Sequence, residues 1–225
     1  MDETDRRAAL TAAESKAETM FAAIEAEGLV APGRTEQQVS EAIFELAERD
    51  FGVKQHWHKR IIRAGPNTVT TFFDNPEERV IQPDDTVYVD LGPVFEAWEA
   101  DIGRTLALGD DARKKQLVAD LPRVFEHVQA HYRASPDITG AELYAFAQRA
   151  ADEAGWVFGG VIAGHLIGEF SHHTWPIERK ETVIAAVNET PMRGPDHLGR
   201  DRHWILEIHL VDADRTFGGF YERLL

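Results

Sequence analysis

The stretch TVYVDLG at residues 86–92 and the strand-like run at residues 100–108 decide the fold. Both runs are rich in apolar and β-branched residues, and the turn-forming residues PDD at 83–85 stand directly before the first run. Because only a short connection separates the runs, we predict an antiparallel pair of strands. Each run holds one aspartate, Asp90 or Asp101, and a charged side chain beside a core is costly unless a partner compensates it.

Helical and strand-like patterns extend outward from this pair toward both ends of the chain. Apolar residues at helical spacing predict helices over residues 5–27, 35–52, 111–132 and 139–154. Further strands are predicted over residues 61–62, 69–73, 157–168, 205–211 and 217–225. Thr35 is the expected N-cap of the second helix, and Gly52 and Gly155 are expected to end their helices. A helix pair followed by strands thus occurs twice, which predicts an α/β (α+β) fold of two similar halves.

Composition narrows the class of protein. The 225 residues predict a single domain over residues 1–225, and a hydrophobic share of 43% is enough for a sizeable core. Lys and Arg number 24 against 39 Asp and Glu, and the net charge of −15 argues against nucleic acid or an anionic membrane as a partner. The sequence has no cysteine, which excludes disulfides, thiolate zinc sites and cysteine nucleophiles. The first residues, MDETDRRAAL, lack the plan of a signal peptide, so we expect a soluble cytoplasmic protein.

Five polar residues that lie within apolar, strand-like segments form a candidate metal site. His165, Glu207 and Glu222 join Asp90 and Asp101, which taken as an isolated pair are also typical of strand-end turns or salt bridges. Four carboxylates and one imidazole suit manganese, iron(II), cobalt or zinc. The set carries too much negative charge for one divalent ion, and two divalent metal ions would balance it.

The motifs VYVDLG (87–92), DIGRT (101–105) and GHLIG (164–168), followed by a strand glutamate and a glutamate near the C-terminus, resemble those of a known family. They are similar to the metallopeptidases that include methionine aminopeptidase, aminopeptidase P, prolidase and metal-free creatinase. The resemblance covers the chain from about residue 35 to the end. The Asp-x-x-Arg-Thr form favours the aminopeptidase P and prolidase branch. The resemblance implies a pita-bread fold, in which a curved antiparallel sheet is flanked by helices.

The same resemblance implies a role for each of the five residues. Asp90 would bind one metal through both oxygens, and Asp101 and Glu222 would bridge both metals. His165 and Glu207 would complete the second metal. Glu207 also matches the carboxylate credited with general acid and base work in the family. A bridging water made acidic by two cations would then attack a peptide carbonyl.

Histidines outside the ligand set show one agreement and one departure. The family has a substrate-contacting histidine seven residues beyond the ligand histidine, which gives His172, whereas counting back from Pro176 gives His173. Either histidine is expected to contact substrate, and the alternative for both is an exposed loop. Phe72 stands where the family carries another active-site histidine, so a donor near the scissile carbonyl is missing.

Four further positions bear on the pocket. His56 or His58 would replace the missing histidine if the fold brought it near, although a His-x-His pair on a strand is more typical of ordinary surface. Leu166 stands where the family commonly has glycine and is expected to narrow the pocket. His209 lies two residues past Glu207 and hence on the same strand face. It would either orient a ligand carboxylate or be a satisfied histidine at a strand edge.

The expected function is a metal-dependent exopeptidase that removes the N-terminal residue of a short peptide. Larger members of the branch carry an additional N-terminal domain that this chain is too short to hold. Its pocket would therefore be completed by its own loops or by a second subunit in a homodimer, and a preference for proline cannot be inferred. A hydrolase of a small non-peptide amide is an alternative that the Phe72 replacement keeps open. A non-catalytic binding protein is a further alternative, against which all five ligand positions are retained.

Overall fold

The computed structural model describes residues 1–170, 180–196 and 198–225. The α-helices are α1 (Glu3–Ala26), α2 (Glu36–Phe51), α3 (Ala112–Ala134) and α4 (Gly140–Glu153). The strands are β1 (Ile61–Ala64), β2 (Thr86–Leu91), β3 (Val94–Phe95), β4 (Trp98–Glu99), β5 (Ile102–Ala107), β6 (Val157–Phe158), β7 (Gly164–Ile167), β8 (His203–Val211) and β9 (Gly218–Leu224). The 3-10 helices are η1 (Gly65–Val69) and η3 (Lys180–Thr182).

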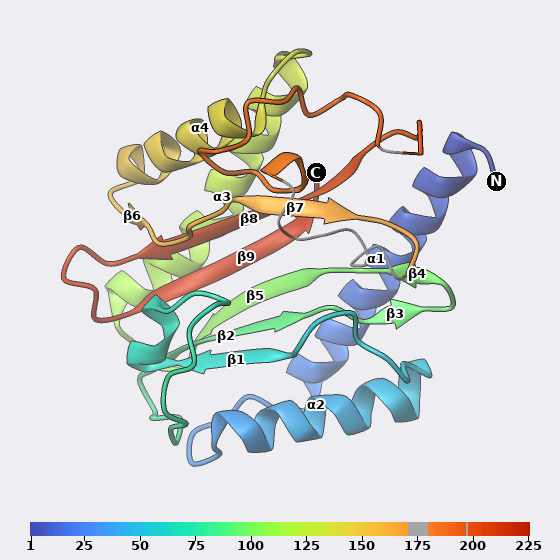
Figure 1. Cartoon of the computed structure of the whole chain (residues 1–225). Coiled ribbons are helices and arrows are strands. Elements are labelled where there is room, and N and C mark those ends of the chain that lie inside the picture. The colour runs from blue at the N-terminus through green and yellow to red at the C-terminus, as the bar shows by residue number, and fades with distance from the viewer. Residues whose placement is uncertain (171–179, 197) are drawn as a thin grey trace.

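One antiparallel sheet runs through the molecule. Its strand order is β1-β2-β5-β9-β8-β6, and β7 pairs with β8 beside this path. The predicted pair is confirmed, since β2 and β5 are antiparallel neighbours from Thr86↔Ala107 to Leu91↔Ile102. Strands β3 and β4 form a separate small hairpin between them. Figure 1 shows the green strands of the first half lying beside the red strands of the second half, so the sheet is shared by both halves.

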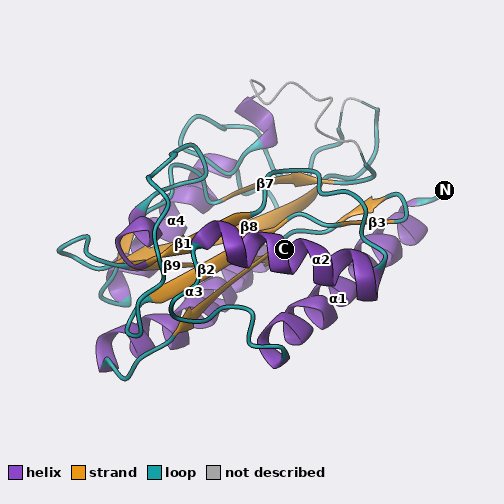
Figure 2. Cartoon of the chain, turned by 90° about the horizontal axis from the view of Figure 1, so that it is seen from below, coloured by secondary structure: helices purple, strands orange, loops and turns teal. Residues whose placement is uncertain are grey.

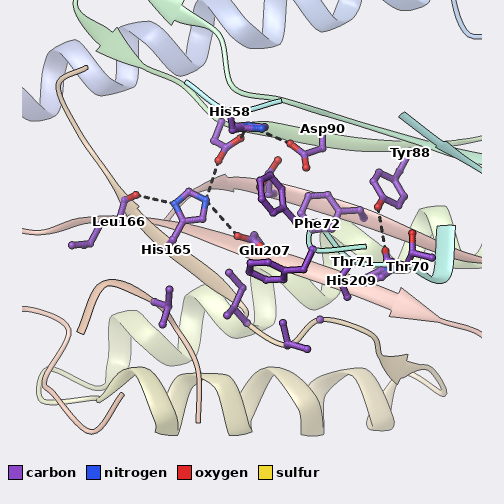
Figure 3. Close-up of a pocket in the computed structure, with 18 of the residues that line it drawn as sticks. His58, Thr70, Thr71, Phe72, Tyr88, Asp90, His165, Leu166, Glu207 and His209 are labelled. Atoms are coloured by element: carbon purple, nitrogen blue, oxygen red, sulfur yellow. Dashed lines mark hydrogen bonds and ion pairs between the residues drawn. The ribbon is translucent and has the colours of Figure 1, made fainter. Parts of the chain in front are cut away.

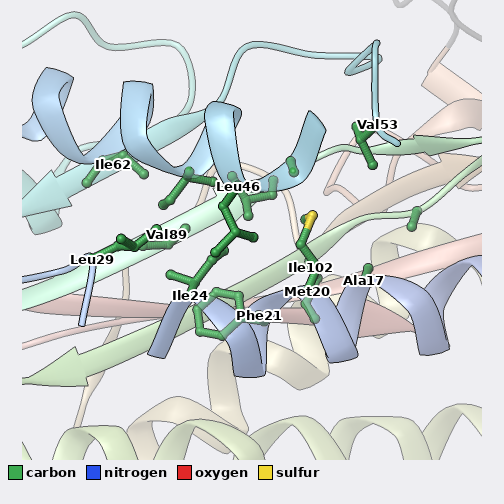
Figure 4. Close-up of a cluster of buried hydrophobic side chains, with 14 of the residues drawn as sticks. Ala17, Met20, Phe21, Ile24, Leu29, Leu46, Val53, Ile62, Val89 and Ile102 are labelled. Atoms are coloured by element: carbon green, nitrogen blue, oxygen red, sulfur yellow. The ribbon is translucent and has the colours of Figure 1, made fainter. Parts of the chain in front are cut away.

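Two hydrophobic clusters pack against the sheet, each built mainly from one half of the chain. In the first half, α1 and α2 pack their apolar faces against β1, β2 and β5, and Figure 4 shows side chains such as Met20, Leu46 and Val89 meeting there. In the second half, α3 and α4 enclose a second cluster with β8, which includes Leu117, Leu143 and Leu206.

The long loops lie on the side of the sheet away from α1, α2 and α3. Figure 2 shows α1, α2 and α3 below the strands, whereas loops cross above them. The packing agrees with this view, because α3 contacts β8 and β9 and α2 contacts β1. A solvent-accessible site is therefore expected on the side of the sheet where the loops lie. Among the described residues, no helix is long and apolar enough to cross a membrane.

The predicted ends of α2 and α4 are confirmed in detail. The Thr35 side chain accepts from the Gln38 main-chain N–H, and the Gln38 side chain accepts from the Thr35 N–H, which is a capping box. Gly52 ends α2 in the left-handed conformation at φ 65°. Thr139 makes the equivalent capping box at the start of α4. Local sequence signals therefore fix where the helices of both halves begin and end.

The strand predicted over residues 69–73 is wrong. Val69 is the last residue of η1, and the residues after it form a turn. Gly65 opens η1 at φ 51°, and the Thr70 N–H donates to the Asn67 carbonyl, which turns the chain out of the sheet direction. Asp74 then accepts from the Thr71 N–H and hydroxyl. The β-branched residues that suggested a strand are thus held by turn hydrogen bonds.

The cap of α2 gives a test of the fold. Thr35→Ala removes one side of the capping box, so we expect the free energy of unfolding to fall by about 1 kcal/mol. Thr19→Ala is the matched control, because Thr19 is exposed within α1 and bonds only back to the Ser15 carbonyl. The control is expected to leave stability unchanged or slightly higher. Urea unfolding followed by circular dichroism measures both, and an equal effect of the two variants would contradict the assigned cap.

Candidate metal centre

Three carboxylates occupy one row across the middle of the sheet. Asp90 on β2 pairs with Gly103 on β5, Gly103 pairs with Glu222 on β9, and Glu222 pairs with Glu207 on β8. Residues that pair directly across neighbouring strands point to the same face of a sheet. The register alone therefore gathers the side chains of Asp90, Glu222 and Glu207 on one face, with a glycine in the gap between the first two.

Two more predicted ligands reach the same row. Asp101 lies two residues before Gly103, just ahead of β5, and so follows the same face. His165 comes from β7, and its Nε2 lies 3.1 Å from Asp101 Oδ2 and 3.4 Å from Glu207 Oε1, as Figure 3 shows for the labelled His165 and Glu207. Ligand atoms of Asp101, His165 and Glu222 lie within 4.8 Å of one another. The structure thus brings together all five residues predicted as metal ligands.

The burial of these carboxylates fits a site built for cations. Asp90, Asp101 and Glu222 are only 6%, 3% and 2% exposed. Within the described part of the chain, Glu222 Oε1 is buried without a hydrogen-bond partner, and Asp90 Oδ1 makes no hydrogen bond although His58 Nε2 lies 3.5 Å away. Buried polar atoms are almost always satisfied, and an unpaired buried carboxylate oxygen is especially costly. A bound divalent cation would satisfy both oxygens, so the residues present fit the metal that the sequence motifs imply.

The metal-free site holds protons that free carboxylates would lose. Burial raises the pKa of Asp90 to about 6 and that of Glu207 to about 7. Burial and the neighbouring carboxylates also raise the pKa of Glu222 well above its ordinary value. The His165 ring resists charge because it is buried, yet its hydrogen bond to Asp101 and the charge of Glu207 raise its pKa to about 9. Protons therefore neutralise a cluster that would otherwise repel itself.

His58 also belongs to the cluster of predicted metal ligands. The interpretation of His58 as an ordinary surface residue is therefore wrong. Its side chain is 7% exposed, and its Nε2 lies 3.1 Å from Asp101 Oδ1 and 3.5 Å from Asp90 Oδ1 (Figure 3). Although burial opposes charge on the ring, the Asp90 and Asp101 carboxylates raise the pKa of His58 to about 9. His56 instead packs its ring against Phe44 and is half-buried. The departure at Phe72 was the one sequence signal that pointed to a second imidazole here.

A pocket opens over the carboxylate row, and aromatic residues form much of its wall. Phe72 lines it at 43% exposure, with its ring in contact with that of His58 at 6.0 Å between centroids. Leu166 lines the pocket too, as expected of a bulky residue in place of glycine.

The Nε2 of His209 is hydrogen-bonded to the Thr68 carbonyl at 2.8 Å, which favours the interpretation of His209 as a satisfied histidine over a role in orienting a ligand carboxylate. The predicted substrate contacts His172 and His173 lie outside the described residues.

Comparison with known proteins agrees with this geometry. A model of metallopeptidase family M24 matches residues 8–193. The chain belongs to metallopeptidase family M24. Strands β8 and β9 lie beyond the matched residues, so Glu207 and Glu222 rest on the register described above. The family membership that the motifs implied is confirmed.

Proteins similar to this M24 chain include an Xaa-Pro dipeptidase, an X-Pro aminopeptidase and a prolidase. It is 29% identical to an Xaa-Pro dipeptidase of Lactobacillus delbrueckii subsp. lactis over 124 residues, 55% of this chain and 33% of that protein. An X-Pro aminopeptidase from Thermotoga maritima MSB8 superposes with a TM-score of 0.74 at 19% identity, covering 98% of this chain and 58% of the other. A prolidase from Thermococcus sibiricus gives 0.72 at 19%, covering 99% and 56%. The pita-bread fold is thus confirmed, while the chain spans about a third of the length of the curated relative.

The glycine in the carboxylate row gives a second prediction. A Cβ built on Gly103 would meet the Phe220 ring at 2.6 Å and Glu222 Oε1 at 3.0 Å. Gly103→Ala must therefore push Glu222 or Phe220 aside, and we expect the affinity for divalent metal to fall by roughly tenfold or more. Gly194→Ala is the control, because its Cβ would meet only the Pro191 carbonyl at 3.6 Å. Titration calorimetry of the metal-free proteins compares them, and unchanged affinity in Gly103→Ala would contradict a metal held beside Glu222.

The raised pKa values predict how pH acts on the metal-free protein. Carboxyls at about 6 and 7 and imidazoles at about 9 all hold protons that the unfolded chain releases earlier. Their contribution to stability is complete below the unfolded pKa values and is lost as pH rises through the folded ones. We expect the melting temperature of metal-free protein to fall between about pH 5 and pH 9 for this reason.

A matched measurement isolates the site from other titrating groups. Metal must displace these protons in order to bind, so its stabilising effect grows as pH rises. The difference in melting temperature between metal-saturated and metal-free protein is therefore expected to widen with pH. A difference that stays constant or narrows would show that the bound metal does not compete with the protons of this cluster.

Proposed function

We propose that the chain is a dinuclear metal-dependent exopeptidase that cleaves N-terminal residues from short peptides. The observation that carries this proposal is the row of buried carboxylates facing a pocket, with two imidazoles aimed at Asp101. Such a row is unstable without positive charge and is open to a ligand on one side. Membership of a metallopeptidase family supplies the general class of reaction.

The ligand set supports two ions rather than one. Four carboxylates carry a charge of −4 when ionised, which two divalent cations balance. Asp90 would hold one ion, His165 and Glu207 the other, and Asp101 and Glu222 would be shared. Manganese, cobalt, zinc and iron(II) all accept this mixture of carboxylate and imidazole. Bound there, two such ions supply an acidified water and stabilise negative charge on a carbonyl oxygen.

Glu207 is the proposed general acid and base. It stands at the end of the row on β8, and its side chain is 14% exposed, so it borders the pocket while the other row members are more deeply buried. A carboxylate in that position is able to take a proton from a water and return it to the leaving amine. His172 or His173 is retained as the substrate-contacting histidine on the strength of the sequence motif.

The substrate is proposed from the relatives and from the wall of the pocket. Relatives of this chain are named Xaa-Pro dipeptidase, X-Pro aminopeptidase and prolidase, so an Xaa-Pro peptide is the first substrate to test. Trp57, Phe72 and Leu166 line the pocket and present apolar surface to such a peptide. Residues 1–225 are proposed to act as one catalytic unit, alone or as a homodimer, and the cytoplasmic location stays a prediction.

Phe72 favours a second candidate function. A phenyl ring has no hydrogen-bond donor for a carbonyl oxygen, and this one borders the pocket close to His58. A hydrolase of a small non-peptide amide has less need of a donor placed for a peptide leaving group. The same metal centre would then act on a different carbon–nitrogen bond. A pita-bread binding protein without activity remains the third account.

One experiment separates these accounts. Purified protein is analysed for metal and assayed with Xaa-Pro peptides, other dipeptides and small amides in added manganese, cobalt or zinc. We expect about two ions per chain and peptide turnover. Asp101→Asn should lose metal and turnover together, whereas Glu207→Gln should lower kcat by roughly a hundredfold or more. Glu25→Gln is the control, because Glu25 is an exposed carboxylate of α1.

Each other outcome has a definite meaning. Two ions with turnover of amides alone would replace the peptidase proposal with the amide hydrolase. Two ions without turnover of any substrate would favour the binding protein. A protein that takes up no divalent metal under any of these conditions would refute the metal centre itself.

A further inference from the structure

His58 is held beside the two aspartates by its neighbour Trp57. The Trp57 N–H donates to the Gly92 carbonyl at 2.9 Å, and its indole Nε1 donates to the Ala100 carbonyl at 3.0 Å. Gly92 follows Asp90 by two residues, and Ala100 directly precedes Asp101. The segment before β1 is therefore tied to both ends of the connection between the two aspartates, which helps to hold His58 beside them.

His58 and His165 make the same pair of contacts. Nδ1 of His58 lies 2.7 Å from the Lys59 carbonyl, and Nδ1 of His165 lies 2.8 Å from the Leu166 carbonyl. In each case the carbonyl belongs to the next residue along the chain. The Nε2 atoms lie 3.1 Å from Asp101 Oδ1 and 3.1 Å from Asp101 Oδ2 respectively. The two imidazoles thus flank the two oxygens of a single carboxylate.

These contacts fix the tautomer of both rings. A carbonyl oxygen only accepts hydrogen bonds, so Nδ1 of each ring must carry hydrogen. When the ring is neutral, its Nε2 then presents a lone pair toward the carboxylates. A main-chain carbonyl on one nitrogen and a free lone pair on the other is the arrangement found in most metal-binding histidines.

The ring of Trp57 packs against both imidazoles and limits their movement. Its centroid lies 4.4 Å from that of His58 and 5.1 Å from that of His165, both in edge-on contacts of 74° and 65°. Side chains held by packing and by a hydrogen bond on the far nitrogen need little reorganisation to bind a ligand. His58 is therefore as well prepared for a metal as the histidine that the motif assigns.

We propose that His58 Nε2 is a sixth protein ligand, binding the ion held by Asp90 and Asp101, so that each of the two ions has one imidazole. Ligand atoms of His58, Asp90 and Asp101 lie within 4.8 Å of one another, as do those of Asp101, His165 and Glu222. The two groups share Asp101. This inference rests on the dinuclear centre proposed above and adds a residue that the five-ligand set leaves out.

A second imidazole changes which metal the site prefers. Replacing an oxygen ligand by imidazole favours cobalt, zinc and iron(II) over manganese, because nitrogen is the softer donor. His58→Asn, which offers an amide oxygen in place of the ring, is expected to weaken cobalt binding at one of the two sites by roughly tenfold or more. Manganese binding should weaken less, since oxygen ligands suit that ion.

The decisive experiment is proton NMR of the protein loaded with cobalt(II). An imidazole bound to cobalt through Nε2 gives a strongly shifted, exchangeable signal from its Nδ1–H. We expect one such signal from His165 and one from His58 in the unaltered protein. His58→Asn should keep only the first, while His56→Asn keeps both, because the His56 ring packs against Phe44 rather than against a carboxylate.

The outcomes distinguish this inference from the function on which it rests. Two bound cobalt ions with only one shifted imidazole signal would overturn the role of His58 and leave the five-ligand dinuclear site intact. No cobalt uptake at all would overturn both proposals. Because the unaltered protein alone shows whether a second signal exists, the result that would overturn the proposal does not depend on whether His58→Asn folds.

Discussion

The repulsion among the buried carboxylates is the constraint on which the rest of this structure depends. The sheet register places Asp90, Glu222 and Glu207 in one row, and no rotation of a single side chain can remove them from it. Positive charge has to be supplied, by protons on the site in the metal-free protein or by metal ions. The imidazoles on either side of Asp101 carry part of that charge when metal is absent. Protons and metal ions therefore compete to neutralise the negative charge of the site.

The same row also joins the two halves of the molecule. Asp90 and Asp101 come from the first half, whereas His165, Glu207 and Glu222 come from the second. Between the halves, β5 and β9 are paired only at Gly103↔Glu222, although each half has an extensive core of its own. Cations bound at the row would therefore add contacts where the main-chain pairing is sparse. Metal binding and the docking of the halves are expected to be linked for that reason.

The sequence predicted the elements that carry local signals and missed those that depend on distant contacts. Capping residues such as Thr35 predicted where helices begin. Five polar residues within apolar, strand-like sequence predicted the metal-ligand cluster. Residues 69–73 were mistaken for a strand because their β-branched composition favours one. The turn is instead made by hydrogen bonds to Asn67 and Asp74, which lie outside this stretch. For His58 the sequence favoured ordinary surface and left a place near the site as the alternative, because its partner Asp101 lies 43 residues away. No periodicity reveals such a contact.

Phe72 and His58 give two neighbouring parts of the pocket lining different chemistry. Residue 72 supplies an aromatic wall with no hydrogen-bond donor, and the Lys59 ammonium lies over the same ring at 4.9 Å from its centroid. The neighbouring His58 ring also lines the pocket, and its Nε2 lies 3.1 Å from Asp101 Oδ1. The ionisable groups of this part of the pocket therefore lie along the carboxylate row rather than at residue 72. Under the proposed peptidase function, a substrate carbonyl would be polarised by the ions proposed for the carboxylate row, because the phenyl ring at residue 72 has no hydrogen-bond donor.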